Sequence, residues 1–221
     1  MPSALDQIMR DYVAPVMRGA GFKKKGRVFF CKSVVGDVVS VQVRAVPGPP
    51  GFYVIYGFID ALSRAYYQHL GASEAISMTA ESQGVFSCRL KPGGAPDWVP
   101  YPDPDRWYYH PWEPESIAEC GGALAARLSS EVVPFLLSVL PRQKLIEFLE
   151  SIRSERLHWH ASTPEAAQQI FRLGTMPTAE ALAEIDAEAA TEGTSLWEDF
   201  MHQHLSAKLE AEAGSPPAVS E

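Results

Sequence analysis

The sequence predicts an α+β fold: an N-terminal helix on a largely antiparallel sheet of about four or five strands, followed by a helical C-terminal extension. Three observations support this prediction. Apolar residues recur at three- and four-residue steps over residues 4–17, as in a helix with one buried face. Residues 28–59 are rich in β-branched and aromatic residues, which alternate with polar ones in the clearest strand. From residue 115 onward, helical patterns predominate.

The first helix has recognisable ends. Ser3 is a suitable N-cap, and Asp6 follows three residues later. Pro15 lies late in the apolar pattern, so we expect it to kink the helix or to split off its last turn. Gly19 and Gly21 are typical of a helix end.

Three strands are predicted next. Val28–Lys32 and residues 38–46 form a predicted hairpin, because residues 34–37 between them have turn chemistry. A link over residues 47–51, rich in proline and glycine, ends the second strand. Residues 52–59 then make a third strand, with every second side chain on the same face.

The remainder of the sheet is less regular in sequence. Residues 85–90 are a predicted fourth strand, and residues 106–110 are a possible fifth strand at a sheet edge. A proline-punctuated loop over residues 91–105 joins them. Residues 61–83 fit either a short helix or a long excursion, and the sequence leaves both open.

Composition sets the predicted domain boundaries. Thr163-Pro164-Glu165 is a typical helix start, and Met176-Pro177-Thr178 begins another helix. Residues 179–212 are rich in Ala and Glu but have few apolar positions, so we expect them to pack peripherally or to be partly mobile. The predicted division is an α+β domain over residues 1–157, an acidic helical extension over residues 158–212 and a disordered tail over residues 213–221.

The composition is that of a globular protein. Of the 221 residues, 46% are hydrophobic and 21% are charged, which excludes the disordered, collagen-like and coiled-coil classes for most of the chain. The longest nearly apolar stretch, residues 132–140, is too short to span a membrane, and the N-terminal segment lacks the pattern of a secretory signal. We therefore expect a cytoplasmic protein without a membrane-spanning helix. Three cysteines without close spacing predict neither a disulfide framework nor a thiolate zinc site.

The net charge of −8 is unevenly distributed. Residues 1–110 carry 12 Lys and Arg against 9 Asp and Glu, whereas residues 111–221 carry 7 against 18. An acidic balance repels the nucleic-acid backbone, so we expect no nucleic acid as a partner. A protein partner with a basic surface fits this charge better.

A basic phrase early in the chain carries a family resemblance. Ala20-Gly21-Phe22-Lys23-Lys24-Lys25-Gly26-Arg27-Val28-Phe29-Phe30 follows the N-terminal helix and precedes a strand that contains Gln42. Trp107-Tyr108 precedes a helical segment, and Val133-Pro134-Phe135-Leu136 lies where a new helix or a turn begins. In these features, over about residues 4 to 150, the chain resembles the bacterial family catalogued as domain of unknown function 4304. No activity is established for that family, so the resemblance implies a fold and no catalytic residues.

Residues 98–112 are the predicted binding surface. Aromatic side chains gather there between prolines and aspartates, as in stacking platforms and in the centres of protein interfaces. The alternative is a loop that its aromatic side chains pin to the sheet. The candidate binding residues are Trp98, Tyr101, Trp107, Tyr108, Tyr109, His110 and Trp112.

A second candidate is an anion-binding cluster at the entry to the first predicted strand. Its members are Lys23, Lys24, Lys25 and Arg27, which flank Gly26. The alternative, which we favour, is a solvated loop that keeps a sheet edge from aggregating.

Metal and nucleophile chemistry find little support. His158 and His160 share a side only if their segment is extended, and His202 and His204 diverge on a helix. No HExxH, nucleophile elbow or phosphate-binding glycine loop is present, so we expect no metal and no cofactor. Asp60, at the end of the third strand, could act as an acid or base with residues downstream, or could cap a turn.

These observations favour a non-enzymatic protein-binding module, by analogy with immunity proteins that mask a toxin. The alternative is a hydrolase-type enzyme with a site between the sheet and the aromatic loop, around Asp60, Trp107 and His110. A deep pocket that holds a histidine beside a carboxylate favours the enzyme. A shallow aromatic patch with an acidic rim favours binding.

Overall fold

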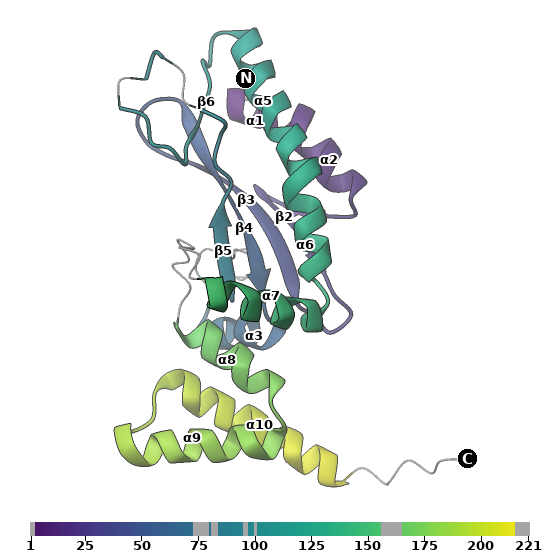
Figure 1. Cartoon of the computed structure of the whole chain (residues 1–221), viewed down its shortest axis with the longest axis vertical. Coiled ribbons are helices and arrows are strands. Elements are labelled where there is room, and N and C mark those ends of the chain that lie inside the picture. Colours follow the sequence, from purple (N-terminus) through teal and green to yellow (C-terminus); the bar gives the residue numbers. More distant parts are fainter. Residues whose placement is uncertain are drawn as a thin grey trace, which may run out of the picture.

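A computed structural model describes residues 3–72, 80, 84–94, 97–99, 101–155 and 165–214 and confirms the α+β fold (Figure 1). Its antiparallel sheet has the strand order β1-β2-β3-β4-β5, and β6 pairs with β4 beside β5. The strands are β1 (Lys23–Lys25), β2 (Val28–Lys32), β3 (Val38–Ala45), β4 (Gly51–Ile59), β5 (Phe86–Arg89) and β6 (Trp107–Tyr108).

The N-terminal helix consists of α1 (Ala4–Ile8), a π-helical turn η1 (Met9–Val13) and α2 (Ala14–Gly19). The Asp6 backbone N–H donates to Ser3 Oγ at 3.2 Å, and the Ser3 backbone N–H donates to an Asp6 carboxylate oxygen at 3.3 Å. This is the reciprocal cap that the sequence predicts. Pro15 lacks an N–H and crowds the carbonyl four residues earlier, and the wide π turn before it accommodates this defect.

A second long helix repeats the arrangement. It consists of α5 (Pro114–Arg127), a π turn η3 (Leu128–Val132) and α6 (Val133–Val139), with Pro134 just after the π turn. The run Pro114–Val139 is long and apolar enough to cross a membrane by length and composition alone. Core helices of other proteins pass the same test, and here one stripe of the run is buried in the main core. The absence of a membrane-spanning helix therefore stays a prediction.

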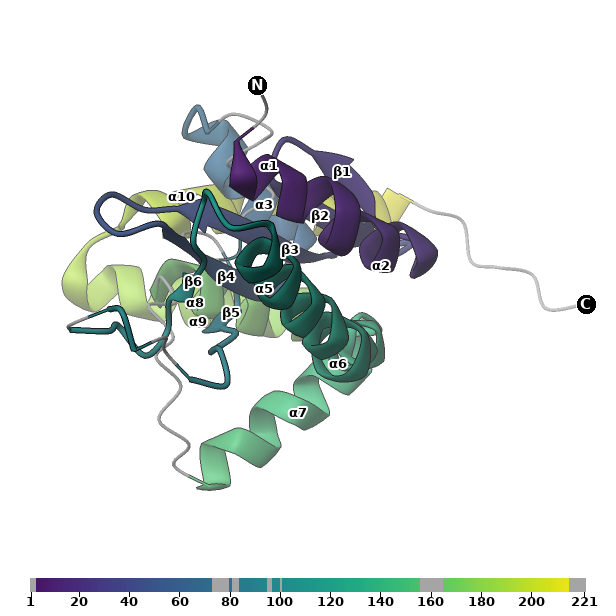
Figure 2. The same cartoon turned by 90° about the horizontal axis from the view of Figure 1, so that it is seen from above.

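The main core lies between these two helices and one face of the sheet (Figure 2). Because side chains alternate along a strand, residues such as Phe29, Val41 and Phe58 all point to that face, and each is fully buried. The two helices approach each other closely at Gly121. A Cβ atom there would lie 2.4 Å from Cδ2 of Tyr12, so only glycine fits.

The predicted strands are correct in the centre of the sheet and less accurate at its edges. Residues 106–110 contain only the two-residue β6, which pairs with β4 through Phe52 and Trp107. Lys23–Lys25 form an edge strand that the sequence did not indicate, with Lys24 opposite Phe29. Valine and phenylalanine side chains facing the core define the central strands, whereas a three-lysine edge strand has no such signal.

The C-terminal helices pack in two cores, since Leu145 lies in the main core and most later buried residues form a second one. They are α7 (Arg142–Glu155), α8 (Glu165–Thr175), α9 (Thr178–Glu192) and α10 (Leu196–Gly214). The ambiguous segment after the third strand begins with α3 (Ala61–His69), and its residues 73–79 and 81–83 lie outside the described part. Side chains of α3, α8, α9 and α10 form this second core, whose buried members are Tyr66, Ile170, Leu173, Ala181, Ile185, Met201 and Leu205. Of the predicted disordered tail, residues 215–221 lie outside the described residues, while Ala213 and Gly214 end α10.

Candidate functional site

Three of the seven predicted binding residues lie in the core. Trp107, Tyr108 and Tyr109 are 3%, 8% and 8% exposed. The Trp107 indole N–H donates to the Leu90 carbonyl at 2.7 Å, and its ring stacks on Phe52 with centroids 6.4 Å apart. These three aromatic residues therefore pin the loop to the sheet, as the alternative interpretation held, and they are not available at the surface.

The other four are exposed or partly exposed and lie before and after β6 in the chain, whose place in the sheet Figure 1 shows. Tyr101 is 93% exposed, Trp112 84% and Trp98 41%. His110 is partly exposed, and its ring meets the Trp98 ring edge-to-face with centroids 4.9 Å apart. We call Trp98, Tyr101, His110 and Trp112 the aromatic surface.

Polar contacts hold the loop that carries this surface. The buried Arg106 guanidinium donates to the carbonyls of Val46 and Pro49 and thereby ties the proline-rich link to the aromatic loop. The Asp103 backbone N–H donates to the Tyr108 hydroxyl at 2.8 Å. The Tyr53 hydroxyl donates to the Asp103 carboxylate, a bond that lowers the pKa of Asp103. The loop is therefore fixed from two strands.

Exposed carboxylates are close in sequence to the aromatic surface. Asp97, Glu113 and Glu115 are exposed, and each lies within three residues of an exposed tryptophan. Glu113 Oε1 lies 3.7 Å from His110 Nδ1, which is itself buried and makes no hydrogen bond within the described residues. Exposed aromatic side chains and exposed carboxylates therefore follow one another along the same stretch of chain, a combination that suits a binding surface.

The predicted anion-binding cluster lies on the edge strand. Lys23, Lys24 and Lys25 are all exposed on β1, and Lys24 extends over the buried Phe29 ring. Arg27 forms an ion pair with Asp6 at 3.1 Å. Charged side chains on a short edge strand oppose edge-to-edge association, so this arrangement fits the solvated alternative.

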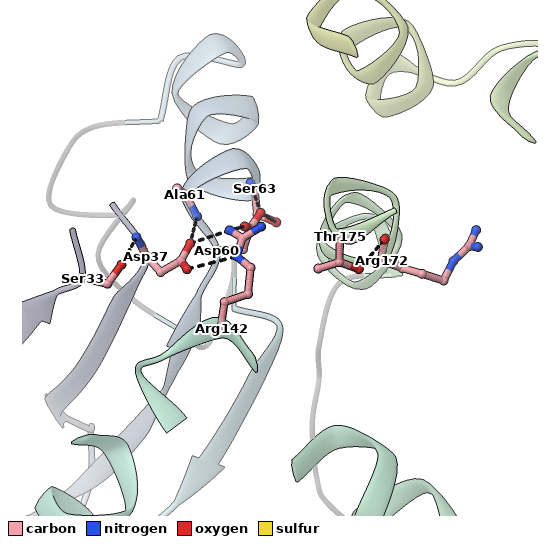
Figure 3. Close-up of polar contacts among 8 residues, drawn as sticks. All are labelled: Ser33, Asp37, Asp60, Ala61, Ser63, Arg142, Arg172 and Thr175. Atoms are coloured by element: carbon pink, nitrogen blue, oxygen red, sulfur yellow. Dashed lines mark hydrogen bonds and ion pairs between the residues drawn. The ribbon is translucent and has the colours of Figure 1, made fainter. Parts of the chain in front are cut away.

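A buried ionic cluster at the opposite end of the sheet is the strongest polar feature that the sequence did not predict (Figure 3). Asp37 and Asp60 are fully buried and both point toward Arg142 at the start of α7. One guanidinium nitrogen, Arg142 Nη2, donates to Asp37 Oδ1 at 2.7 Å and to Asp60 Oδ1 at 2.5 Å. The remaining oxygens are occupied as well: Arg142 Nε donates to Asp37 Oδ2, and Ser63 donates to Asp60 Oδ2.

This cluster joins four parts of the fold. Asp37 precedes β3 and Asp60 is the N-cap of α3, as the capping interpretation of Asp60 predicts. Arg142 belongs to α7, and its guanidinium lies 5.4 Å from the ring centroid of Phe171 on α8. Burial raises the pKa of Asp60, although its hydrogen bonds and Arg142 oppose the rise. The chemistry is that of an internal tie, because every carboxylate oxygen already accepts a hydrogen bond from the protein.

The structure separates the residues of the proposed hydrolase site. Trp107 pairs with Phe52 near the start of β4, whereas Asp60 follows its end. At about 3.3 Å per residue, the eight steps from Phe52 to Asp60 span roughly 26 Å. Asp60 therefore does not meet Trp107 and His110.

Two thiols and the described histidines show no sign of a reactive group. Burial raises the pKa of Cys88 and of Cys120 to about 12 in each case, so both thiols are protonated at neutral pH. Among the described residues, no group of three or more metal-binding side chains is assembled. His202 lies 3.4 Å from Asp186, and the His204 ring stacks on Phe200. His158 and His160 lie outside the described residues.

The last two helices account for the net negative charge of the protein. α9 and α10 lie side by side beyond α8 (Figure 1). Residues 178–214 contain 9 Asp and Glu against 1 Lys, a net charge of −8, while the remaining residues contain 18 acidic and 18 basic side chains. We call α9 and α10 the acidic hairpin. Composition already predicted an acidic extension, but only the structure shows that it is a paired unit.

No protein-family model, no curated protein and no solved structure matches the chain significantly. The family resemblance therefore stays an expectation from sequence.

Proposed function

We propose that this protein is a non-enzymatic binding module of the bacterial cytoplasm that captures a protein with a basic surface, and that the acidic hairpin is its docking face. The observation that carries the proposal is the location of the charge. The acidic hairpin has a net charge of −8, and the rest of the chain is neutral. Such a field attracts a basic partner and orients it before contact.

The construction of the hairpin supports this role. Buried residues of both helices, such as Ile185 and Met201, pack in the second core, so the two helices are held together as one packed platform. The acidic side chains Glu180, Glu188 and Asp199 remain exposed on it. The Arg172 guanidinium binds Glu184 and joins α8 to α9, which fixes the platform to the helix before it. A partner bound to this face has its basic surface masked, as a toxin is masked by an immunity protein.

The polar groups elsewhere favour binding over catalysis. Asp37 and Asp60 are occupied by Arg142, and the thiols of Cys88 and Cys120 are held protonated. The competing hydrolase needs Asp60 beside the aromatic loop, and the length of β4 keeps them apart.

The test is capture from a lysate of the source organism with three forms of the full chain. The wild type is compared with a hairpin variant and with a body variant of equal charge. The hairpin variant carries Glu180→Gln, Glu188→Gln and Asp199→Asn, and the body variant carries Glu119→Gln, Glu147→Gln and Glu150→Gln.

We expect the wild type and the body variant to retain the same basic protein, which high salt releases. The hairpin variant should bind it about tenfold more weakly, because three exposed ion pairs contribute roughly 0.5 kcal/mol each. Equal binding by the hairpin variant and the wild type contradicts the proposal. A captured protein with an acidic surface contradicts it as well.

A further inference from the structure

Besides the acidic hairpin, the aromatic surface is the second exposed feature of the protein that suggests a binding role. Trp112 and Tyr101 are 84% and 93% exposed. Large aromatic side chains dominate interface energetics, and tryptophan and tyrosine are over-represented among the residues that contribute most to binding. The other aromatic residues of this loop, Trp107 to Tyr109, are buried. The exposed rings therefore make no contribution of that kind to the core.

Polar contacts hold the loop that precedes and includes β6, next to these rings. Arg106 ties it to the proline-rich link, and Asp103 joins it to Tyr53 of β4 and to Tyr108 of β6. Trp98 packs edge-to-face against His110, which connects the two parts of the surface. A loop whose backbone is already held in place loses less conformational entropy when a partner binds.

The chemistry of the surface selects a cation. The face of an indole or phenol ring carries partial negative charge and attracts an ammonium or guanidinium group. Asp97, Glu113 and Glu115 are exposed carboxylates that lie within three residues of Trp98 or Trp112 in the sequence. Glu113 lies 3.7 Å from His110 Nδ1, which places one carboxylate directly at the aromatic surface.

We infer that the aromatic surface binds an arginine-bearing segment of the partner protein, with the guanidinium stacked on Trp112 and paired with Glu113. Arginine fits better than lysine, because its planar guanidinium can stack on a ring and at the same time donate two hydrogen bonds to a carboxylate. The inference rests on the proposed function, since it names a second place at which the same basic partner is recognised.

The test uses a synthetic twelve-residue peptide of alternating arginine and glycine as the probe. Binding to the full chain is followed by NMR through the indole N–H signals, with the Trp112 signal assigned from the Trp112→Ala variant. Three further forms of the chain are compared. Glu113→Gln removes the carboxylate, Val34→Ala changes an exposed apolar residue at the other end of β3 and β4, and the hairpin variant lacks three charges of the acidic hairpin.

We expect the peptide to shift the Trp112 signal saturably. Trp112→Ala and Glu113→Gln should each weaken binding about three- to tenfold, and Val34→Ala should leave it within twofold of the wild type. Trp112 is exposed, so its loss should not change the unfolding midpoint; an unchanged midpoint verifies that the variant is folded.

Three results overturn the inference: no saturable shift, equal binding by wild type and Trp112→Ala, or tighter binding of a glutamate–glycine peptide or of cellohexaose than of the arginine peptide. If only the hairpin variant loses the peptide, the aromatic site is refuted and the proposed function stands. If the peptide binds at Trp112 but the hairpin variant captures the natural partner as well as the wild type does, the docking face is refuted and the arginine site stands.

Discussion

Removing the Arg142 side chain tests whether the buried cluster is an internal tie. Arg142→Met keeps most of the aliphatic stem but leaves Asp37 and Asp60 as two adjacent buried carboxylates without a counter-ion. Breaking a buried ion pair from one side costs about 3–5 kcal/mol. The Arg142 side chain is still 27% exposed, so solvent reaches it and the lower half of that range applies.

The assay is urea unfolding at pH 7, with Arg172→Met as the matched control. The Arg172 side chain also pairs with a carboxylate, Glu184, but is 45% exposed, so its loss should cost about 1 kcal/mol or less. In thermal unfolding of a chain of this size, 3 kcal/mol corresponds to a fall in Tm of roughly 6–12 °C. If Arg142→Met is no more destabilising than Arg172→Met, the interpretation of the buried cluster as an internal tie is wrong.

The same variant has a pH dependence of defined sign. Burial already raises the pKa of Asp60 from its ordinary value of 3.8, and loss of Arg142 should raise it further. A carboxyl with a raised pKa binds more protons in the folded than in the unfolded state, so stability falls as pH rises from about 4 toward the folded pKa. The difference in stability between wild type and Arg142→Met should therefore be smallest near pH 4 and largest at pH 7. A difference that does not change with pH contradicts this reasoning.

Three further predictions concern packing and reactivity. Gly121→Ala should destabilise the fold by about 1–3 kcal/mol in urea unfolding, because the new Cβ meets the Tyr12 ring; an unchanged midpoint would show that the ring moves aside. Trp107→Ala should cost about 3–5 kcal/mol in the same assay because the indole is core, and a loss under 1 kcal/mol would return it to the surface. Cys88 and Cys120 should react with a thiol reagent at pH 8 roughly a thousandfold more slowly than a free cysteine, as their raised pKa predicts, whereas rapid labelling of either would show that it is accessible.

The sequence predicted best where side chains repeat with the period of a helix or strand. The N-terminal helix and the strands β2, β3 and β4 were predictable because their buried residues recur on one face. The edge strand β1 and the two-residue β6 have no such repeat, since their places in the sheet come from pairing with β2 and β4.

The sequence indicated where an aromatic site lies, but not which of its residues are exposed. An aromatic loop is visible in the sequence, yet nothing in it distinguishes the buried Trp107 from the exposed Trp112. That distinction depends on which residue pairs with Phe52 of β4. Asp37 and Arg142 are separated by 105 residues, so their ion pair has no local signal at all. The acidic charge of the C-terminal extension, by contrast, follows from composition and could be predicted, although the pairing of its two helices could not.

Zero-length carbodiimide cross-linking tests the central claim most directly, because this reagent joins carboxylates to lysine amines only where the two are in contact. The captured partner is cross-linked to the wild-type chain, and the linked residues are identified by mass spectrometry. We predict links from the partner's lysines to the acidic hairpin, through Glu180, Glu188 or Asp199. Links confined to carboxylates of the α+β body, such as Glu119 and Glu150, would contradict the account.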